Sequence, residues 1–184
     1  MRVPPPLAGP TRDRLVQAFG RISLLVDRLL RECGEEIVCR HGCAACCRQV
    51  LNLRGVEASF LLEGARALPG EAVSLIWQHL PASGTDGPCP LLHGGLCLAY
   101  DHRPAVCRTH GLPMLRREGG ETLVHHCAEN FRGADASLLS PSLLLDEERL
   151  SLLMDAVDAL YCMETGWGGD RISVEQLLRS GLHT

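Results

Sequence analysis

The chain has 184 residues, a formal net charge of −4 and 46% hydrophobic residues. This composition predicts a single folded domain, residues 1–184, and excludes a disordered chain. The mild acidity argues against nucleic acid as a partner, since such proteins need many phosphate-neutralising Lys and Arg side chains. Aromatic residues, at 4%, also offer few surfaces on which bases could stack.

The N-terminal residues MRVPPPLAGP predict a loose, Pro-rich leader over residues 1–10, without the apolar core of a signal peptide. No run of about 18 apolar residues occurs, so we expect neither a membrane-spanning helix nor a membrane partner. The protein is therefore expected to be cytoplasmic. The cytoplasm keeps thiols reduced. The ten cysteines of the chain therefore indicate metal ligation or thiol chemistry rather than a disulfide framework.

Apolar periodicity predicts a long helix that begins near Thr11. Its stripe has steps of three and four residues and consists of Leu15, Phe19, Ile22, Val26, Leu29 and Cys33. We expect Cys33 to be a small core residue at the end of this stripe. Two shorter helices are predicted over residues 55–68 and 71–80, separated by the breaker pair Pro69-Gly70.

The C-terminal part predicts a hairpin and two further helices. Residues 113–126 favour a hairpin around Glu118-Gly119-Gly120. A helix is predicted over residues 143–163, with Cys162 well off its apolar face of Leu150, Leu153, Val157 and Leu160. Ser173 to Gln176 has the capping-box pattern of a last helix. The fold class is therefore mainly α: a helical shell around an irregular, turn-rich cysteine cluster, with one small β-hairpin.

The stretch CRHGCAACC, residues 39–47, supplies Cys39, Cys43, Cys46 and Cys47. The spacing of Cys43 and Cys46 lets a tight turn aim two thiolates at one ion, and Gly42 stands where such a turn favours a positive φ. The neighbours Cys46 and Cys47 point in different directions in either regular backbone. Cys47 therefore serves a second site, bridges a polynuclear cluster, or stays free.

A second group of cysteines follows in CPLLHGGLCLAYDHRPAVCRTHG, residues 89–111, which supplies Cys89, Cys97 and Cys107. Gly94-Gly95 would let the chain fold back and bring Cys89 near Cys97. Cys127 follows in HHCAENF. The eight candidate metal ligands, all between residues 39 and 127, could fill two four-coordinate sites or hold one iron–sulfur cluster with ligands to spare.

Arginines follow several of these cysteines, and thiolates bound to a metal leave negative charge that positive groups can offset. Arg103 and Arg108 are therefore the candidate cofactor-binding residues, and Arg40 and Arg48 have similar positions in the first cluster. Four histidines lie near cluster cysteines, and any of them could replace one thiolate: His41, His110, His125 and His126.

The motifs CAACC and CPLL…GLCLAYDHRPAVCR, in this order, resemble the CxxCxxCC or YkgJ-type family of cysteine-cluster domains. The resemblance covers residues 39–127 and implies a metal-binding region that chelates zinc or iron. In the second motif it includes Tyr100, Arg103-Pro104 and Cys107-Arg108. One departure is that three residues separate Cys39 from Cys43, where the family motif has two.

Three functions remain open at this point. The first is a metal-binding protein that holds zinc, or a [4Fe-4S] cluster, through its cysteines, with a metal ion or cluster as its partner. The second is an iron–sulfur redox enzyme or electron carrier. The third is a metal-free thiol oxidoreductase in which Cys43 and Cys46 form a reversible disulfide. The sequence identifies no catalytic residue.

Overall fold

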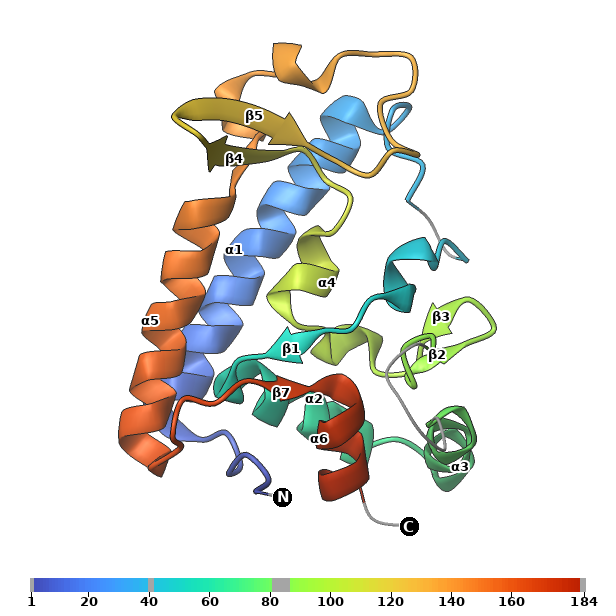
Figure 1. Ribbon diagram of the computed structural model, residues 1–184, viewed down its shortest axis with the longest axis vertical. Helices are drawn as coiled ribbons and strands as arrows, with labels where there is room; N and C mark the ends of the chain where they lie inside the picture. Colours follow the sequence, from blue (N-terminus) through green and yellow to red (C-terminus); the bar gives the residue numbers. More distant parts are fainter. Residues whose placement is uncertain (1, 40–41, 81–86, 183–184) are drawn as a thin grey trace.

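The computed structural model describes residues 2–39, 42–80 and 87–182. Within these ranges the chain forms six α-helices and several short strands, which confirms the mainly α fold class. The long helices α1 (Gly9–Cys33) and α5 (Glu147–Thr165) pack side by side and run in opposite directions (Figure 1). None of the described helices is long and apolar enough to cross a membrane.

Helix α1 carries the predicted apolar stripe. Leu15 and Leu29 are fully buried, and Cys33 is a buried residue at the end of the stripe, as expected. The Pro-rich residues before α1, expected to be loose, make specific contacts instead. Leu7 is buried, and the carbonyl of Pro5 accepts hydrogen bonds from the Tyr161 hydroxyl at 2.6 Å and the Ser59 hydroxyl at 2.7 Å.

Helix α5 begins four residues later than predicted, because a 3-10 turn (Pro141–Leu143) and the short strand β6 (Leu145–Asp146) take up the residues before it. Its buried face was also predicted wrongly in part. Val157 is buried, and Leu150 and Leu153 pack half-buried against the same core, but the fully buried neighbours of Val157 are Met154 and Tyr161. The packing against α1 and α2 selects this slightly rotated face. Cys162 is half-buried against the same core.

The second helical layer consists of α2 (Gly55–Arg66), α3 (Gly70–His79) and α6 (Val174–Gly181). Pro69 stands between α2 and α3, as predicted. The short strands β1 (Asn52–Leu53) and β7 (Ile172–Ser173) pair antiparallel and join the beginning of α2 to that of α6. Ser173 and Gln176 form the predicted capping box at the start of α6.

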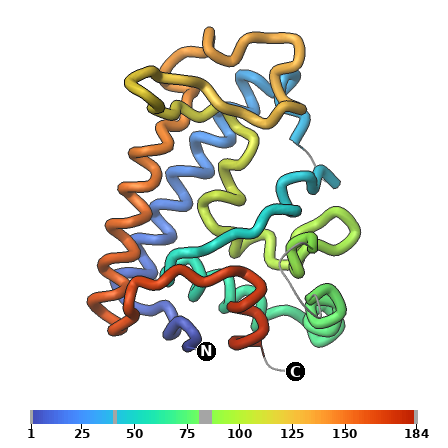
Figure 2. Tube along the Cα trace, in the orientation of Figure 1, coloured from blue at the N-terminus to red at the C-terminus, as the bar shows by residue number. Residues whose placement is uncertain are grey.

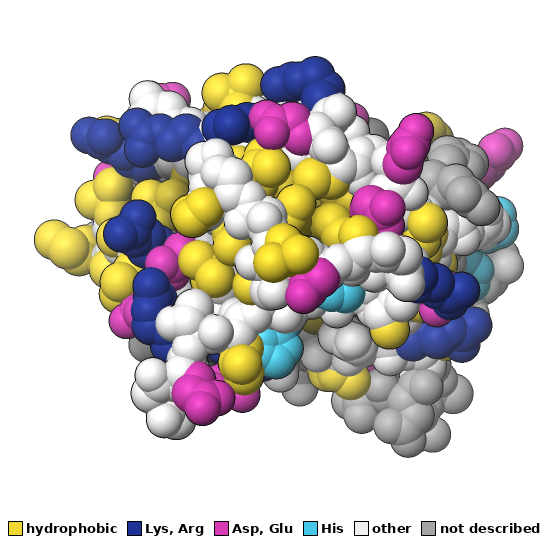
Figure 3. Space-filling view, turned by 90° about the horizontal axis from the view of Figure 1, so that it is seen from above, with side chains coloured by type: hydrophobic (Ala, Val, Ile, Leu, Met, Phe, Trp, Pro, Cys, Tyr) yellow, Lys and Arg dark blue, Asp and Glu magenta, His cyan; other side chains and the backbone are white. Residues whose placement is uncertain are grey.

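A small sheet covers one end of the α1–α5 pair. Strands β4 (Met114–Glu118) and β5 (Glu121–His125) form the predicted hairpin, whose turn residues Gly119 and Gly120 both have positive φ. Strand β6 adds to β4 in parallel, which the sequence did not predict. Seen from this end, apolar side chains gather between charged ones (Figure 3), and exposed residues of β5 and the following 3-10 turn, Leu123 and Leu138, are apolar.

The turn η1 and the β2–β3 hairpin lie away from α5, on the side of the molecule where the chain is irregular (Figures 1 and 2). This side contains the 3-10 turn η1 (Ala45–Arg48), the two-residue strands β2 (Leu92–His93) and β3 (Leu96–Cys97), and the short helix α4 (Ala105–Thr109). The structure therefore combines a helical frame with an irregular cysteine-rich flank.

Replacing the helix cap Asp146 by Ala should lower the free energy of unfolding by about 1 kcal/mol at pH 7. Asp146 accepts a hydrogen bond from the Arg149 N–H, and hydrogen bonds from Arg117 lower its pKa to about 2. Since the folded pKa lies below the ordinary value of 3.8, this stabilisation exists above pH 4 and is lost as the pH falls towards 2.

Urea denaturation of the native protein and Asp146→Ala, over the pH range in which both are folded, checks this expectation. The difference between the two proteins should shrink as the pH is lowered. Asp170→Ala, at an exposed position, is the matched control and should change stability by less than about 0.5 kcal/mol. A difference that is constant with pH would contradict the assigned role of Asp146.

Candidate metal centre

A backbone hydrogen bond joins the two cysteine-rich parts of the chain. The N–H of Cys89 donates to the carbonyl of Cys47 at 2.7 Å. The Leu92 N–H donates to the Cys89 carbonyl at 2.9 Å, and Leu92 is paired with Cys97 across the β2–β3 hairpin. The fold-back at Gly94-Gly95 that the sequence predicted is thus present, and it places Cys97 beside Cys89.

Helix α4 brings Cys107 to the same place. The charges of the Cys89, Cys97 and Cys47 thiols act to raise the pKa of the Cys107 thiol. We call these four residues, Cys47, Cys89, Cys97 and Cys107, the Cys107 group. Arg103 precedes α4, and its positive charge acts to lower the pKa values of Cys47, Cys97 and Cys107.

The Cys107 group is the more deeply buried part of the cluster. Burial, followed by the charges of the neighbouring thiols, raises the pKa of Cys107 to about 12, and burial raises the pKa of Cys89 to about 11. Burial also raises the pKa of Cys97. Without a cation these thiols keep their protons at neutral pH, and metal binding would displace the protons.

Two of the remaining four thiols of the cluster, Cys39 and Cys127, lie beside Gly111. The charges of Cys43, Cys127 and Cys46 act to raise the pKa of Cys39, and we call these four residues, Cys39, Cys43, Cys46 and Cys127, the Cys39 group. A Cβ atom at Gly111 would lie only 3.2 Å from the Cys39 sulfur and 3.2 Å from the Cys127 Cβ. Gly111 has a φ of +84°, so only glycine suits both the backbone and the space between the two cysteines.

Asn130 connects Cys39 to Gly111 from below the surface. Its side chain is 1% exposed. Its amide nitrogen donates to the Gly111 carbonyl at 2.6 Å and lies 3.4 Å from the Cys39 sulfur, and its amide oxygen accepts from the Val38 N–H at 3.0 Å. An N–H group directed at a cysteine sulfur is the kind of contact that supports a thiolate ligand.

The two groups meet at the neighbouring residues Cys46 and Cys47, which are in contact with each other. The β2–β3 turn also touches the first cluster, because a Cβ atom at Gly95 would lie 3.1 Å from the Gly42 Cα. Gly42 has the positive φ that its place in the turn predicted. Segments far apart in the sequence thus converge around the vicinal cysteines.

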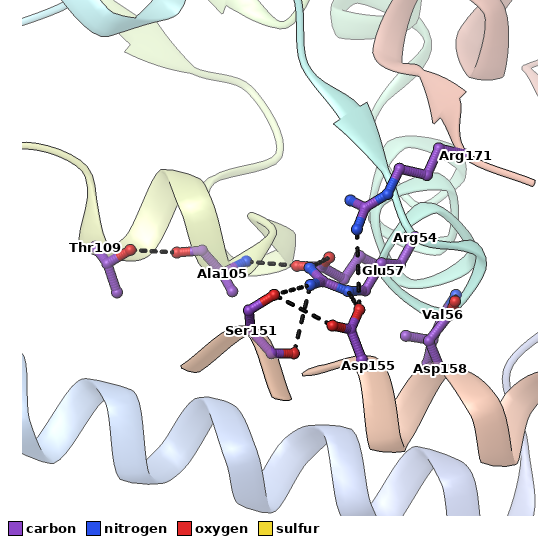
Figure 4. Close-up of polar contacts among 9 residues, drawn as sticks. All are labelled: Arg54, Val56, Glu57, Ala105, Thr109, Ser151, Asp155, Asp158 and Arg171. Carbon is purple, nitrogen blue, oxygen red and sulfur yellow. Dashed lines mark hydrogen bonds and ion pairs between the residues drawn. The ribbon is translucent and has the colours of Figure 1, made fainter. Parts of the chain in front are cut away.

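A polar network around the buried Glu57 carboxylate holds α4, which carries Cys107, against the helical frame (Figure 4). The Glu57 carboxylate accepts a hydrogen bond at 2.8 Å from the N–H of Ala105, the first residue of α4. Arg54 pairs with Glu57 at 3.4 Å and with Asp155 of α5 at 2.6 Å. Glu57 is 3% exposed, so this carboxylate is a structural anchor rather than a surface charge.

The two candidate arginines have different surroundings. Arg103 lies against the Tyr100 ring at 3.4 Å and acts electrostatically on three thiols of the Cys107 group. The Arg108 guanidinium lies 4.3 Å from the Phe19 ring centroid and donates to the carbonyls of Arg103 and Asp101. Arg108 thereby fixes the turn before α4 against α1.

The histidines near the cysteines are distributed as follows. His41 and Arg40 lie outside the described residues. His125 and His126 are exposed, and one ring nitrogen of His126 lies 2.9 Å from the Cys127 carbonyl. His110 is half-buried in the turn after α4. Sequence reasoning missed Glu57, Gly111 and Asn130, since each acts through burial and contacts that no spacing pattern records.

All ten cysteines are free thiols. Within the described ranges, no group of three or more His, Cys, Asp or Glu side chains stands as a formed metal site. The chemistry of the gathered donors nevertheless fits zinc or iron, because sulfur ligands select these metals and both accept four of them. A Cβ atom at Gly111 would fill the space next to the Cys39 sulfur, so the glycine leaves that space open.

The fold and the gathered thiols define a helical protein with a cysteine cluster that suits a thiophilic metal. Residues 38–128 match the model of the CxxCxxCC family, described as "Putative zinc- or iron-chelating domain". The matched segment belongs to this family and includes every cysteine of both groups. Searches of curated proteins and of solved structures gave no match.

Replacing Glu57 by Ala should lower the free energy of unfolding by about 2 kcal/mol, because it leaves the buried N–H of α4 without an acceptor and removes a partner of Arg54. Chemical denaturation measures this change. Glu71→Ala, which removes an exposed glutamate from α3, is the matched control and should change stability by less than about 0.5 kcal/mol. Equal effects of the two substitutions would contradict the anchoring role of Glu57.

Proposed function

We propose that this chain is a cytoplasmic metal-binding protein of a single domain that chelates zinc or iron through the cysteines of its two groups. The observation that carries the proposal is the convergence of eight free thiols from separate segments into one flank of the fold. Free thiols suit a reducing compartment. The family description, zinc or iron chelation, agrees with this donor set.

The ligands in this proposal are Cys39, Cys43, Cys46, Cys47, Cys89, Cys97, Cys107 and Cys127. A structural metal at such a site contributes on the order of 10 kcal/mol to folding. Contact between the two cysteine-rich parts depends on short strands, turns and single hydrogen bonds, which are weak by themselves. A metal that ties them together would therefore stabilise the part of the fold with the least regular structure.

An iron–sulfur redox protein or electron carrier is the second candidate. It is favoured by Arg103 beside the Cys107 group and by the Asn130 amide beside Cys39, since charge and hydrogen bonds near sulfur set the potential of a [4Fe-4S] cluster. A metal-free thiol oxidoreductase is less well supported. Such enzymes use thiols of lowered pKa, whereas burial raises the pKa of Cys46.

Anaerobic purification, followed by elemental analysis and an absorption spectrum of the same sample, tests the proposal. The same measurements distinguish bound zinc from a [4Fe-4S] cluster. Zinc gives a colourless protein with stoichiometric zinc. A [4Fe-4S] cluster gives a brown protein with iron and acid-labile sulfide, whose colour dithionite bleaches. A protein that neither contains metal nor takes up zinc or iron on reconstitution would contradict the proposed function.

Replacing Cys46 by Ser should remove bound metal and lower the melting temperature together, because a proposed ligand is lost. Each kcal/mol of lost stability lowers the melting temperature by about 2–4 °C in a chain of this size. Cys33→Ala is the control, since Cys33 is buried in the core between α1 and the small sheet. It should leave metal content unchanged. Metal loss in Cys33→Ala but not in Cys46→Ser would overturn the ligand assignment.

A further inference from the structure

Strand β5 forms one edge of the small sheet. The strand order is β5-β4-β6, so β4 has a neighbour on both sides and β5 has one on a single side. In the part of the chain that the structure describes, no backbone hydrogen bond from outside the hairpin reaches Thr122 or Val124. Figure 1 shows the hairpin at the end of the molecule, beyond the α1–α5 pair. An unpaired strand edge is a template for a further strand.

The register of the hairpin determines which backbone groups point outward. Glu121 directly follows the two-residue turn and therefore exchanges its backbone hydrogen bonds with β4. In an antiparallel ladder such residues alternate along the strand, so Leu123 and His125 also face β4. The N–H and C=O groups of Thr122 and Val124 therefore point to the open edge, which presents two donors and two acceptors.

The side chains of β5 suit a paired strand. Thr122 and Val124 are β-branched, and such residues are favoured in strands. Leu123 between them is 38% exposed, a large apolar side chain at an open edge. Edges that avoid pairing carry Lys or Pro, or charges at the centre of the strand. These three residues include neither a charge nor a proline.

A second copy of β5, antiparallel and centred on Leu123, matches the open edge. Thr122 then lies opposite Val124 of the second copy, so the outward N–H and C=O groups of both strands find partners. Leu123 lies opposite its own counterpart at a non-hydrogen-bonded position, where Cβ atoms are about 4.5–5.5 Å apart. Glu121 lies opposite His125, whose ring N–H can donate to the carboxylate. No like charges face each other in this register.

We propose that the protein forms a symmetric dimer in which the outer edges of two β5 strands pair, so that the two small sheets become one continuous sheet. The partner is a second copy of this chain because a two-fold axis through Leu123 satisfies the same groups on both strands at once. Strand β5 has five residues, whereas standard interfaces use about 20–30 residues a side. The dimer is therefore expected to be weak and to depend on protein concentration.

Sedimentation velocity of the full chain in reducing buffer, over a range of concentrations, tests the proposal. The mass should rise from that of one chain to that of two as the concentration increases. Leu123→Asp should weaken the dimer at least about tenfold, since two carboxylates replace the central apolar contact. Leu152→Asp, which changes a 61% exposed leucine of α5, is the matched control and should leave the dimer unchanged.

Thr122→Pro tests the backbone pairing separately. Proline removes an N–H that points outward and that the hairpin does not use, so the chain should stay folded while the dimer is lost. Thr122→Ala keeps this N–H and is the control. Circular dichroism checks that each variant is folded. If Thr122→Pro does not fold, the comparison of Leu123→Asp with Leu152→Asp decides.

A native protein that stays a single chain at every concentration overturns the proposal, and an edge that pairs only with a strand of another protein would give this result. A dimer that folded Leu123→Asp and Thr122→Pro leave intact, or that Leu152→Asp weakens equally, also overturns it. A dimer that is lost in both β5 variants and kept in both controls supports it. None of these outcomes depends on whether the cysteines bind a metal.

Discussion

The hydrogen bond from the Cys89 N–H to the Cys47 carbonyl is the contact on which the cysteine cluster depends. It joins a turn that precedes α2 and α3 to a hairpin that follows these two helices. Through it, cysteines that are far apart in the sequence share one flank of the molecule. The contact of Gly95 with Gly42 reinforces this junction, and glycine at both positions keeps the two backbones close.

The helical frame gives this irregular flank a fixed support. Helices α1 and α5 form one core with the face of α2 that carries Val56 and Phe60, and another face of α2 forms a second core with α3 and α6. Cys89 and Cys97 pack against the second of these cores. Glu57 and Arg54 connect α2, α4 and α5 in a single polar network, so the position of Cys107 is set by the same helices that bury most of the apolar surface.

Much of the frame could be predicted from local sequence. The α1 stripe, the Pro69 break, the Gly119-Gly120 turn and the Ser173 capping box are each encoded within a few residues, which is why the structure agrees with them. The buried face of α5 was predicted wrongly in part because several rotations of a leucine-rich helix are similar in hydrophobicity, and packing selects between them. The pairings of β1 with β7 and of β4 with β6 involve two residues per strand, too few for a pattern.

The candidate cysteines were identifiable from the sequence, but their arrangement in the fold was not. The vicinal pair indicated that Cys47 could serve a second site, yet only the folded chain shows which thiols lie near it. Asn130, Gly111 and Glu57 support the cluster through burial and hydrogen bonds between distant segments. No spacing rule reveals such residues, because their partners are chosen by the tertiary structure.

X-ray absorption at the edge of the bound metal is the most direct test of the claim that these sulfurs converge on an inorganic centre. The account predicts a first shell of about four sulfur atoms, at about 2.3 Å if the metal is zinc. An iron–sulfur cluster would give the same sulfur shell with neighbouring iron atoms beyond it. A first shell made mainly of nitrogen and oxygen would contradict the account.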